Sequence, residues 1–395
     1  MGGGPAGIST ALFLAHAAPE RAERIVVLEK ERYPREKFCA GGLGARADQL
    51  LGSIGVAVDV PSVPVRGVAL RTSAATLVVR DERDGPVGRV VRRIEFDEAL
   101  ARSAAARGIR IVEGARVESL RLLRDRVEVH SSRGAFRADV VVGADGVGST
   151  VRRALGLSAT RWHAQALEVD TEPADGDLAR DLLVFDVKNR ALPGYYWEFP
   201  TLVGGRELVC RGVYFLRDAR ARGAAVDIQA LLQQELAQRG LDLARCKKKR
   251  FAERGFEPHA AIARPRALLV GEAAGIDPVT GEGIPQAIQY GATAGRYLAR
   301  KLAERDLELC DWPDEVGGSS VGRDLLVRTL GVELFYGSRR RAVERFLVET
   351  PDVVRVGLQH FAGKRWSKRA LARAGVSALG HTAAALLGHN PPPRD

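Results

Sequence analysis

Three glycines at the start of the chain have the spacing of a phosphate-binding turn. Gly2, Gly4 and Gly7 form the pattern Gly-x-Gly-x-x-Gly, and an apolar, alanine-rich segment follows over residues 8–16. In dinucleotide-binding folds such glycines let the backbone approach a pyrophosphate at the N-terminus of a helix. The spacing therefore predicts a nucleotide-cofactor turn followed by a helix.

A carboxylate follows at the distance that this kind of site requires. Glu29 stands 22 positions after Gly7 and closes the apolar run 25–28, which predicts a buried parallel strand. A carboxylate there can accept hydrogen bonds from both ribose hydroxyls, and its charge disfavours a 2′-phosphate. The other interpretation of Glu29 is the first residue of an ordinary charged loop over residues 29–32.

Two further glycine-bearing segments carry acids at turn positions. One is VGADGVGSTVR at 142–152, and the other is VGEAAGIDPVTGEGI at 270–284. In this order, together with the N-terminal glycines, they resemble the three signatures of the flavoproteins related to p-hydroxybenzoate hydroxylase. The resemblance implies an extended FAD that runs past Asp145, and an isoalloxazine ring at the helix N-terminus near Ile284.

The resemblance also implies which residues contact the FAD. Relatives usually have Asp where this chain has Glu272, so the carboxylate of Glu272 is expected to be displaced by about one bond length. The implied cofactor-binding positions are Gly2, Gly4, Pro5, Ala6, Gly7, Glu29, Lys30, Arg35, Cys39, Ala40, Gly41, Arg102, Val117, Asp145, Gly146, Gly271, Glu272, Gly281, Gly283 and Ile284.

Two segments support a narrower resemblance, to the geranylgeranyl reductase branch of these flavoproteins. FCAGGL at 38–43 is similar to its Cys-x-Gly-Gly segment, and GYYWEFP at 194–200 to its Tyr-x-Trp-x-Phe-Pro motif. The resemblance implies that Cys39 lies near the flavin, where it protonates or positions the product. The alternative is that Cys39 is a small packing residue against the ring.

The second of these segments predicts an apolar wall. Alternation along a strand places Tyr195, Trp197 and Phe199 on one face, which suits a prenyl chain or a polycyclic ring. These three aromatic residues are the predicted substrate pocket. The alternative is an inter-sheet core face that binds no ligand.

The composition is that of a globular protein with more than one packed unit. The chain has 395 residues, is 46% hydrophobic and 28% charged, and carries a formal net charge of +11. It shows neither an apolar run of membrane-spanning length nor a basic signal sequence, and its four cysteines lack metal-binding spacing, so we expect a cytoplasmic protein without a metal site. The basic run 247–250 predicts a solvated edge rather than a nucleic-acid site.

The order of the elements predicts an α/β fold in three parts. We expect a discontinuous, Rossmann-like FAD-binding domain over residues 1–70, 94–160 and 258–310. A β-rich substrate domain over 71–93 and 161–257 interrupts it, and a helical region follows over 311–395. One strand of 138–146 is expected to lead into the second glycine turn.

The strand that should precede the first glycine turn is missing from this sequence, because Met1 occupies the position of its last residue. A start several residues upstream in the natural protein would explain this, and a real gap in the sheet is the alternative. We expect weak FAD retention by the chain as it stands, since the absent strand is central in such sheets.

These observations predict an FAD-dependent oxidoreductase that acts on a hydrophobic substrate, favoured as a reductase of C=C bonds. The alternative is an FAD-dependent monooxygenase that hydroxylates or epoxidises a secondary metabolite. A degenerate flavin-binding protein without activity is a further alternative. A flavin-dependent halogenase is disfavoured because no lysine lies between Lys37 and Lys188.

The electron donor and the location remain open at this point. There is no second glycine fingerprint for NAD(P)H, so electrons would come from transiently docked NAD(P)H, a flavin reductase or ferredoxin. The basic C-terminal part, including 364–366 and the apolar stretch 370–387, is expected either to contact a membrane surface peripherally or to cap the substrate domain.

Overall fold

The computed structural model describes residues 1–81, 85–220, 226–364 and 375. The apolar stretch 370–387 therefore falls almost entirely outside the described residues, as do 365 and 366. Within the described ranges, no helix combines the length and the apolar character needed to cross a membrane.

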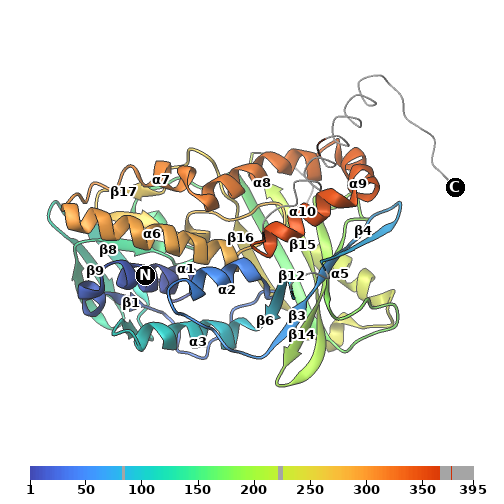
Figure 1. Cartoon of the computed structure of the whole chain (residues 1–395), viewed down its shortest axis with the longest axis horizontal. Coiled ribbons are helices and arrows are strands. Elements are labelled where there is room, and N and C mark those ends of the chain that lie inside the picture. The colour runs from blue at the N-terminus through green and yellow to red at the C-terminus, as the bar shows by residue number, and fades with distance from the viewer. Residues whose placement is uncertain (82–84, 221–225, 365–374, 376–395) are drawn as a thin grey trace.

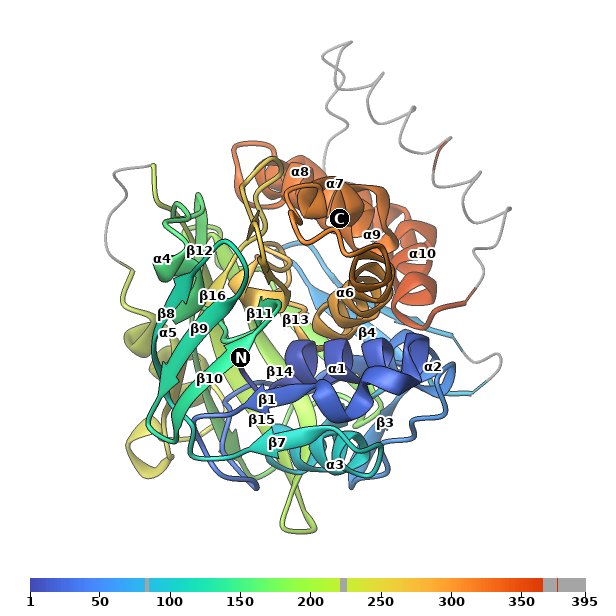
Figure 2. The same ribbon diagram turned by 90° about the vertical axis from the view of Figure 1, so that its left-hand side faces the viewer.

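Two helices pack closely at the centre of the first domain. Helix α1 (Pro5–Ala17) lies against the long helix α6 (Ile284–Glu304), as Figures 1 and 2 both show. Two glycines of α6 permit this approach. A Cβ atom at Gly291 would lie 2.5 Å from the Cβ of Ser9, and one at Gly295 would lie 2.6 Å from the backbone nitrogen of Leu14. Both helices begin at glycine turns predicted to bind the cofactor.

Small sheets surround this helix pair. Strand β1 pairs in parallel with β7, and β11 pairs in parallel with β18. The strands are β1 (Val26–Leu28), β7 (Arg110–Val112), β8 (Val117–Leu122), β9 (Val127–Ser131), β10 (Gly134–Ala138), β11 (Val141–Gly143), β17 (Ala263–Arg264) and β18 (Ala267–Leu269). The predicted strand 138–146 is thus two elements, because β10 closes a hairpin with β9 before β11 begins.

A seven-stranded sheet forms the second domain and lies beside the first (Figure 1). In spatial order its strands are β16 (Lys249–Arg254), β12 (Trp162–Thr171), β15 (Arg206–Asp218), β14 (Gly194–Val203), β13 (Leu182–Asp186), β4 (Gly67–Arg71) and β5 (Thr76–Arg80). Strand β4 belongs to this sheet, whereas the sequence predicts residues 67–70 as part of the FAD-binding domain. It pairs in parallel with β13, a long-range contact that local composition does not reveal.

A fourth small sheet joins the two domains. Its order is β2 (Gly42–Gly44), β6 (Gly88–Val91) and β3 (Ser62–Val65), so residues 88–91, predicted for the β-rich substrate domain, pair in this sheet and not in the seven-stranded one. The helices that remain are α2 (Ala45–Gly52), α3 (Arg93–Ala105), α4 (Thr150–Ala154), α5 (Ile228–Ala237), α7 (Trp312–Gly318), α8 (Ser320–Tyr336), α9 (Arg340–Glu349) and α10 (Pro351–Phe361), with short 3-10 turns η1 (Pro19–Arg24), η2 (Leu243–Arg245) and η3 (Gly271–Ala273).

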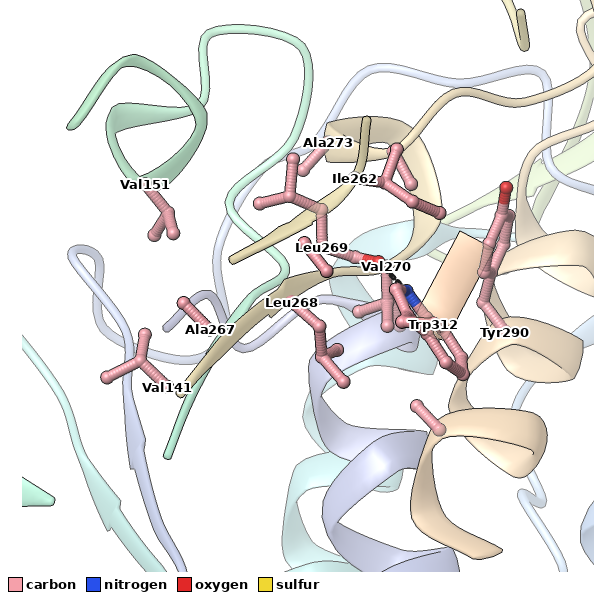
Figure 3. Close-up of a cluster of buried hydrophobic side chains, with 14 of the residues drawn as sticks. Val141, Val151, Ile262, Ala267, Leu268, Leu269, Val270, Ala273, Tyr290 and Trp312 are labelled. Atoms are coloured by element: carbon pink, nitrogen blue, oxygen red, sulfur yellow. Dashed lines mark hydrogen bonds between the residues drawn. The ribbon is translucent and has the colours of Figure 1, made fainter. Parts of the chain in front are cut away.

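The C-terminal helices pack onto both domains. Trp312 of α7 is fully buried, and its indole Nε1–H donates a hydrogen bond of 2.9 Å to the carbonyl oxygen of Leu269 (Figure 3). Leu268 and Leu269 of β18 lie in the same buried cluster. Helix α7 and the first part of α8 therefore belong to the hydrophobic core beneath the third glycine motif.

Met1 and Gly2 stand where the expected strand would end. The amino group of Met1 donates a 2.8 Å hydrogen bond to the carbonyl of Val142, and the Met1 carbonyl accepts one of 2.8 Å from Ala144. On the other side, the amide of Gly2 donates to the carbonyl of Leu28, also at 2.8 Å. These backbone bonds bridge the carboxyl ends of β1 and β11.

Behind this bridge the sheet is open. A cavity of about 700 Å³ lies between the edges of β1 and β11, lined by residues 25–28 and 139–142 and by apolar side chains of α1 and α6. Burial lowers the pKa of the Met1 amino group, since the charged form loses its water. This cavity is bordered by two strand edges, as the site of one additional parallel strand would be.

Joining six apolar residues to Met1 tests this. We expect the added segment to pair with β1 and β11, to remove the buried amino terminus, and to raise the melting temperature and the FAD retained through purification. The gain is on the order of 1.5 kcal/mol of unfolding free energy for each fully buried apolar side chain. A Gly/Ser extension of equal length is the control, and equal flavin content in the apolar variant and the control would refute the expectation.

Candidate FAD-binding site

A cavity of about 960 Å³ lies where the three glycine motifs meet. Its volume is near the upper end of the range for cofactor sites, roughly 300–1,000 Å³. Most of the predicted cofactor-binding residues line it. They are Gly2, Gly4, Pro5, Ala6, Glu29, Lys30, Arg35, Cys39, Val117, Asp145, Gly146, Glu272, Gly281, Gly283 and Ile284.

The N-terminus of α1 opens into this cavity. Its N-cap, Gly4, has no side chain to cap the free amides, and a Cβ there would approach only Arg35 and Arg93, at 3.7 and 3.9 Å. Gly2 has a positive φ of 97°, and a Cβ would lie 2.2 Å from the carbonyl oxygen of Ala144. The uncapped amides and the helix dipole make this end suited to a pyrophosphate.

Glu29 is fixed by the turns around it. One carboxylate oxygen accepts a 2.7 Å hydrogen bond from the Gly3 amide, and the other accepts one of 3.0 Å from the Glu31 amide. The guanidinium of Arg35 lies 3.5 Å from the same carboxylate. A carboxylate has about four acceptor positions, so Glu29 retains capacity for ribose hydroxyls while its orientation is set by the backbone.

An arginine that sequence reasoning missed lies beside the same helix end. Arg93 lines the cavity, and its guanidinium makes two hydrogen bonds of 2.7 and 2.8 Å to Asp97. Asp97 is fully buried and also pairs with Arg35 at 3.0 Å. One carboxylate thus holds two guanidinium groups at the N-terminus of α1, where phosphate oxygens would bind. No sequence pattern distinguishes Arg93 from the neighbouring arginines Arg89 and Arg92.

Arg102 does not line the cavity, so its prediction has to be corrected. Nine residues after Arg93 along α3, it lies on the opposite side of the helix. Its side chain is 78% exposed and pairs with Glu98 at 2.6 Å.

Four other predicted positions lie just outside the cavity and act through backbone geometry. A Cβ at Gly7 would meet the Gly2 carbonyl at 2.0 Å, and one at Gly41 would meet the Val91 carbonyl at 2.0 Å. Gly271, with a φ of 59°, lets η3 approach α1, because a Cβ would lie 2.6 Å from that of Ala6. Ala40 packs at the edge of the core of the large sheet.

The second motif is stabilised by its own aspartate. Asp145 accepts hydrogen bonds from the Ser149 hydroxyl at 2.5 Å and from the Thr150 and Val151 amides at 2.7 and 3.1 Å. It therefore orders the start of α4 as well as lining the cavity. Glu272, the residue that replaces the usual Asp, also lines it and pairs with Lys37 at 3.9 Å.

The third motif is a turn over residues 277–283 that surrounding groups hold tightly. Asp277 accepts from the Val279 amide at 2.7 Å and the Thr280 amide at 3.2 Å. Three tyrosine hydroxyls donate hydrogen bonds to backbone carbonyl oxygens of this turn. Tyr195 donates to Thr280 at 2.5 Å, Tyr214 donates to Pro278 at 3.1 Å, and Tyr336 donates to Val279.

A partly buried arginine from α8 completes this turn. Arg328 pairs with Asp277 at 2.5 Å, with Glu282 at 2.6 Å and with Asp324 at 3.1 Å. Burial alone would lower the pKa of Arg328, but the three carboxylates raise it well above its ordinary value. A helix of the C-terminal region thus positions the third motif, and nothing in the local sequence around Arg328 signals this role.

The turn ends at a second uncapped helix N-terminus. Gly283, the N-cap of α6, provides no side-chain cap, and Gly283 and Ile284 both line the cavity. The positive end of this 21-residue helix would stabilise negative charge on a reduced isoalloxazine ring. Two uncapped helix ends at one cavity fit a cofactor with a pyrophosphate and a ring that becomes anionic.

Cys39 lines the cavity close to the large sheet. Its amide donates a 3.1 Å hydrogen bond to Glu168 of β12, and the Gly41 amide donates to its sulfur at 3.4 Å. Burial raises the pKa of the thiol, so the neutral thiol is the stable form. Lys249 pairs with Glu168 at 3.7 Å and Asp170 at 2.6 Å. This lysine is buried, which corrects the expectation of a wholly solvated edge over 247–250.

The three aromatic residues predicted for the substrate pocket share one face of β14 and are buried. Tyr195 stacks on Tyr214 with ring centroids 5.1 Å apart, and Phe185 packs edge-on against Tyr195 and Phe199. Trp197 belongs to the same cluster. They stand behind the third motif rather than in the lining of the 960 Å³ cavity. A role for them in substrate binding stays a prediction.

The fold and this site define an FAD-dependent oxidoreductase of the p-hydroxybenzoate hydroxylase type. Residues 1–312 match the model of the FAD binding domain family, and the chain belongs to that family. The expected cofactor, FAD, is supported by this match, and the predicted class of enzyme is confirmed.

Similar proteins agree with the narrower resemblance as well. The chain is 29% identical over 352 residues to the menaquinone reductase of Mycobacterium tuberculosis, covering 82% of each protein. It is 29% identical over 332 residues to the digeranylgeranylglycerophospholipid reductase of Methanothrix thermoacetophila, covering 78% of each. A geranylgeranyl bacteriochlorophyll reductase-like protein from Thermoplasma acidophilum shares its fold, with a TM-score of 0.76 at 20% identity over 98% of each chain.

Replacing Arg328 by Met tests the role of α8 in the site. We expect a loss of about 3 kcal/mol in unfolding free energy, since three carboxylates lose their partly buried partner, and weaker FAD binding as the turn 277–283 relaxes. Fluorescence titration with FAD and chemical denaturation measure the two effects. Arg323→Gln, at an exposed position of the same helix, should leave both unchanged. Wild-type FAD affinity in a folded Arg328→Met variant would contradict the assigned role.

Proposed function

We propose that this enzyme reduces C=C bonds in the prenyl chain of a lipid. The observation that carries the proposal is the junction of the cavity with the large sheet. There the third glycine motif, Cys39 and Phe251 line the cavity, and Phe251 packs against the cluster of buried aromatic residues of the large sheet. The named relatives are reductases of menaquinone and of a digeranylgeranyl phospholipid, both of which carry prenyl chains.

Different residues of the chain would contribute to different parts of such a reaction. Bound FAD would supply the hydride, which an alkene cannot obtain from protein side chains. The N-terminus of α1, with Arg35 and Arg93, would bind the pyrophosphate, and Glu29 the ribose. The turn held by Arg328 orients the end of the cavity next to the apolar face. Tyr195 and Tyr214 exclude water behind that turn.

The electron donor is also part of the proposal. NAD(P)H docking transiently at the cavity, or an external flavin reductase or ferredoxin, would reduce the flavin. Glu29 favours FAD over a 2′-phosphorylated nucleotide at the ribose position, so NADPH would have to approach elsewhere.

A halogenase has less support from the site. Such enzymes need a lysine that holds the oxidant between flavin and substrate. Lys37 lines the cavity but pairs with Glu272, and Lys249 is bound by Asp170 and Glu168.

Product mass distinguishes reduction from oxygenation. The purified enzyme is loaded with FAD, reduced anaerobically with dithionite, and mixed with menaquinone or with a geranylgeranyl phospholipid. We expect a product heavier by two hydrogens for each turnover, formed without oxygen. A product heavier by one oxygen, formed only when air is admitted, would contradict the proposal and establish the monooxygenase. Protein with free FAD removed is the control.

We propose in addition a peripheral contact with anionic lipid through α8. Five apolar side chains of this helix are exposed, with Val327 at 69% and Leu330 at 68%. The others are Leu326, Leu334 and Phe335. Exposed arginines, Arg323, Arg339 and Arg341, lie on or just after the helix. An apolar strip flanked by basic residues is typical of helices that rest on anionic membranes, and such a location would suit a prenyl substrate.

Co-sedimentation with liposomes tests the lipid contact. We expect the protein to pellet with vesicles that contain phosphatidylglycerol, and Val327→Asp/Leu330→Asp to remain in the supernatant, because each charge opposes insertion of the strip. Glu207→Gln, at an exposed position of β15 outside α8, is the surface control. Equal pelleting of the double variant and the wild type would exclude α8 as the contact.

A further inference from the structure

We propose that Glu253 of β16 is the acid that delivers the proton when the double bond is reduced. The inference rests on the proposed C=C reduction and adds to it a catalytic group at the junction of the cofactor cavity with the large sheet. Glu253 was absent from the sequence-based predictions, because it stands in a polar stretch, AERGFE, that resembles an exposed edge.

Glu253 lies at the part of the cavity where the reaction would occur. It lines the cavity together with Phe251, Gly281 and Ile284. A Cβ atom at Gly281 would lie only 2.7 Å from the Oε2 atom of Glu253, so the carboxyl rests directly against the third motif. Gly281 is in the left-handed region, with a φ of 64°, and its missing side chain makes room for the carboxyl.

The neighbours of Glu253 on the sheet give it no structural partner. Strand pairing places Ala164 of β12 opposite Glu253, and Leu216 of β15 follows in the same row. The adjacent row holds Phe251, Ala166 and Tyr214. Oε2 is inaccessible to solvent, and no donor among the described residues reaches it. An acid in such a position costs stability unless it serves a function.

The surroundings favour the protonated form of the carboxyl. Burial raises the pKa of Glu253 well above its ordinary value, and the nearby carboxylate of Glu272 raises it further. Lys37 acts in the opposite direction, while Asp277 and Glu168 add to the increase. A carboxylic acid that is neutral at pH 7 can donate a proton to carbon, whereas a carboxylate cannot.

The reaction balances with this one acid. Bound, reduced FAD would supply a hydride, with its electron pair, to one alkene carbon. The O–H bond of Glu253 breaks as a new C–H bond forms at the neighbouring carbon, and the carboxylate that remains takes its next proton from water at the open end of the cavity. The alkene is reduced by two electrons and the flavin is oxidised by two.

Cys39 is the competing donor, and the geometry favours Glu253. The thiol of Cys39 accepts the Gly41 amide hydrogen, and the Cys39 segment is fixed through Glu168. Burial raises the pKa of this thiol, and the carboxylate of Glu168 raises it further. The carboxyl of Glu253, in contrast, has no hydrogen-bond partner at Oε2 among the described residues and rests against Gly281 of the third motif.

Glu253→Gln removes the transferable proton and keeps the size of the side chain. In anaerobic single-turnover experiments with the FAD holoenzyme and a geranylgeranyl phospholipid, we expect flavin reoxidation to slow by roughly 10²–10⁴-fold. FAD affinity should stay within about twofold, because a neutral group replaces a neutral group. Glu253→Asp retains an acid and should recover part of the rate, and Cys39→Ser should slow turnover far less than Glu253→Gln.

Infrared spectroscopy gives a readout that needs neither FAD nor substrate. At pH 7 the spectrum of the wild type should contain the carbonyl band of a protonated carboxyl that Glu253→Gln loses. Glu207→Gln, whose side chain is 68% exposed, should lose no such band.

Three results would overturn the inference. They are the absence of that band, reoxidation of Glu253→Gln at the wild-type rate, and a loss in Cys39→Ser as large as in Glu253→Gln. Failure of the wild type to reduce any prenyl substrate would defeat the proposed function first, and this role with it. Wild-type reduction with an unaffected Glu253→Gln variant would defeat this role alone.

Discussion

The cofactor cavity depends on how Met1 and Gly2 are held between β1 and β11. The carbonyl and amino groups of Met1 bond to residues 142–144, and the amide of Gly2 bonds to Leu28. These few backbone bonds aim the start of α1 at the cavity. Gly291 and Gly295 bring α6 against α1 from the other side, so the two uncapped helix ends face one space. A displacement of the first turn would separate the pyrophosphate end from the ring end of the site.

The ring end is held by parts of the chain that are distant in sequence. Tyr195 and Tyr214 belong to the large sheet, and Tyr336 and Arg328 to α8, yet all four bind the turn 277–283. The domain that would receive substrate and the C-terminal helices therefore share the task of shaping the cofactor site. This arrangement places Glu253, a residue of the large sheet, directly against a turn of the FAD-binding domain.

Much of the site could be predicted from sequence because its determinants are local. The glycine turns, Glu29 and the strand that ends at Leu28 follow from short patterns with a clear physical reason. Arg93, Arg328 and Glu253 could not be found in this way. Only the three-dimensional structure shows that Arg93 and Arg35 share Asp97, and that Arg328 pairs with Asp277 of the third motif. The strand β4 was assigned to the wrong unit for the same reason, since its partner β13 lies more than a hundred residues away.

An experimental structure of the chain with FAD tests the central claim most directly. The account predicts one extended FAD in the 960 Å³ cavity, with its pyrophosphate at the N-terminus of α1, its adenosine ribose at Glu29, and its isoalloxazine ring beside Gly281 and the start of α6. FAD bound elsewhere, or in this cavity with its ring at Glu29, would contradict the account.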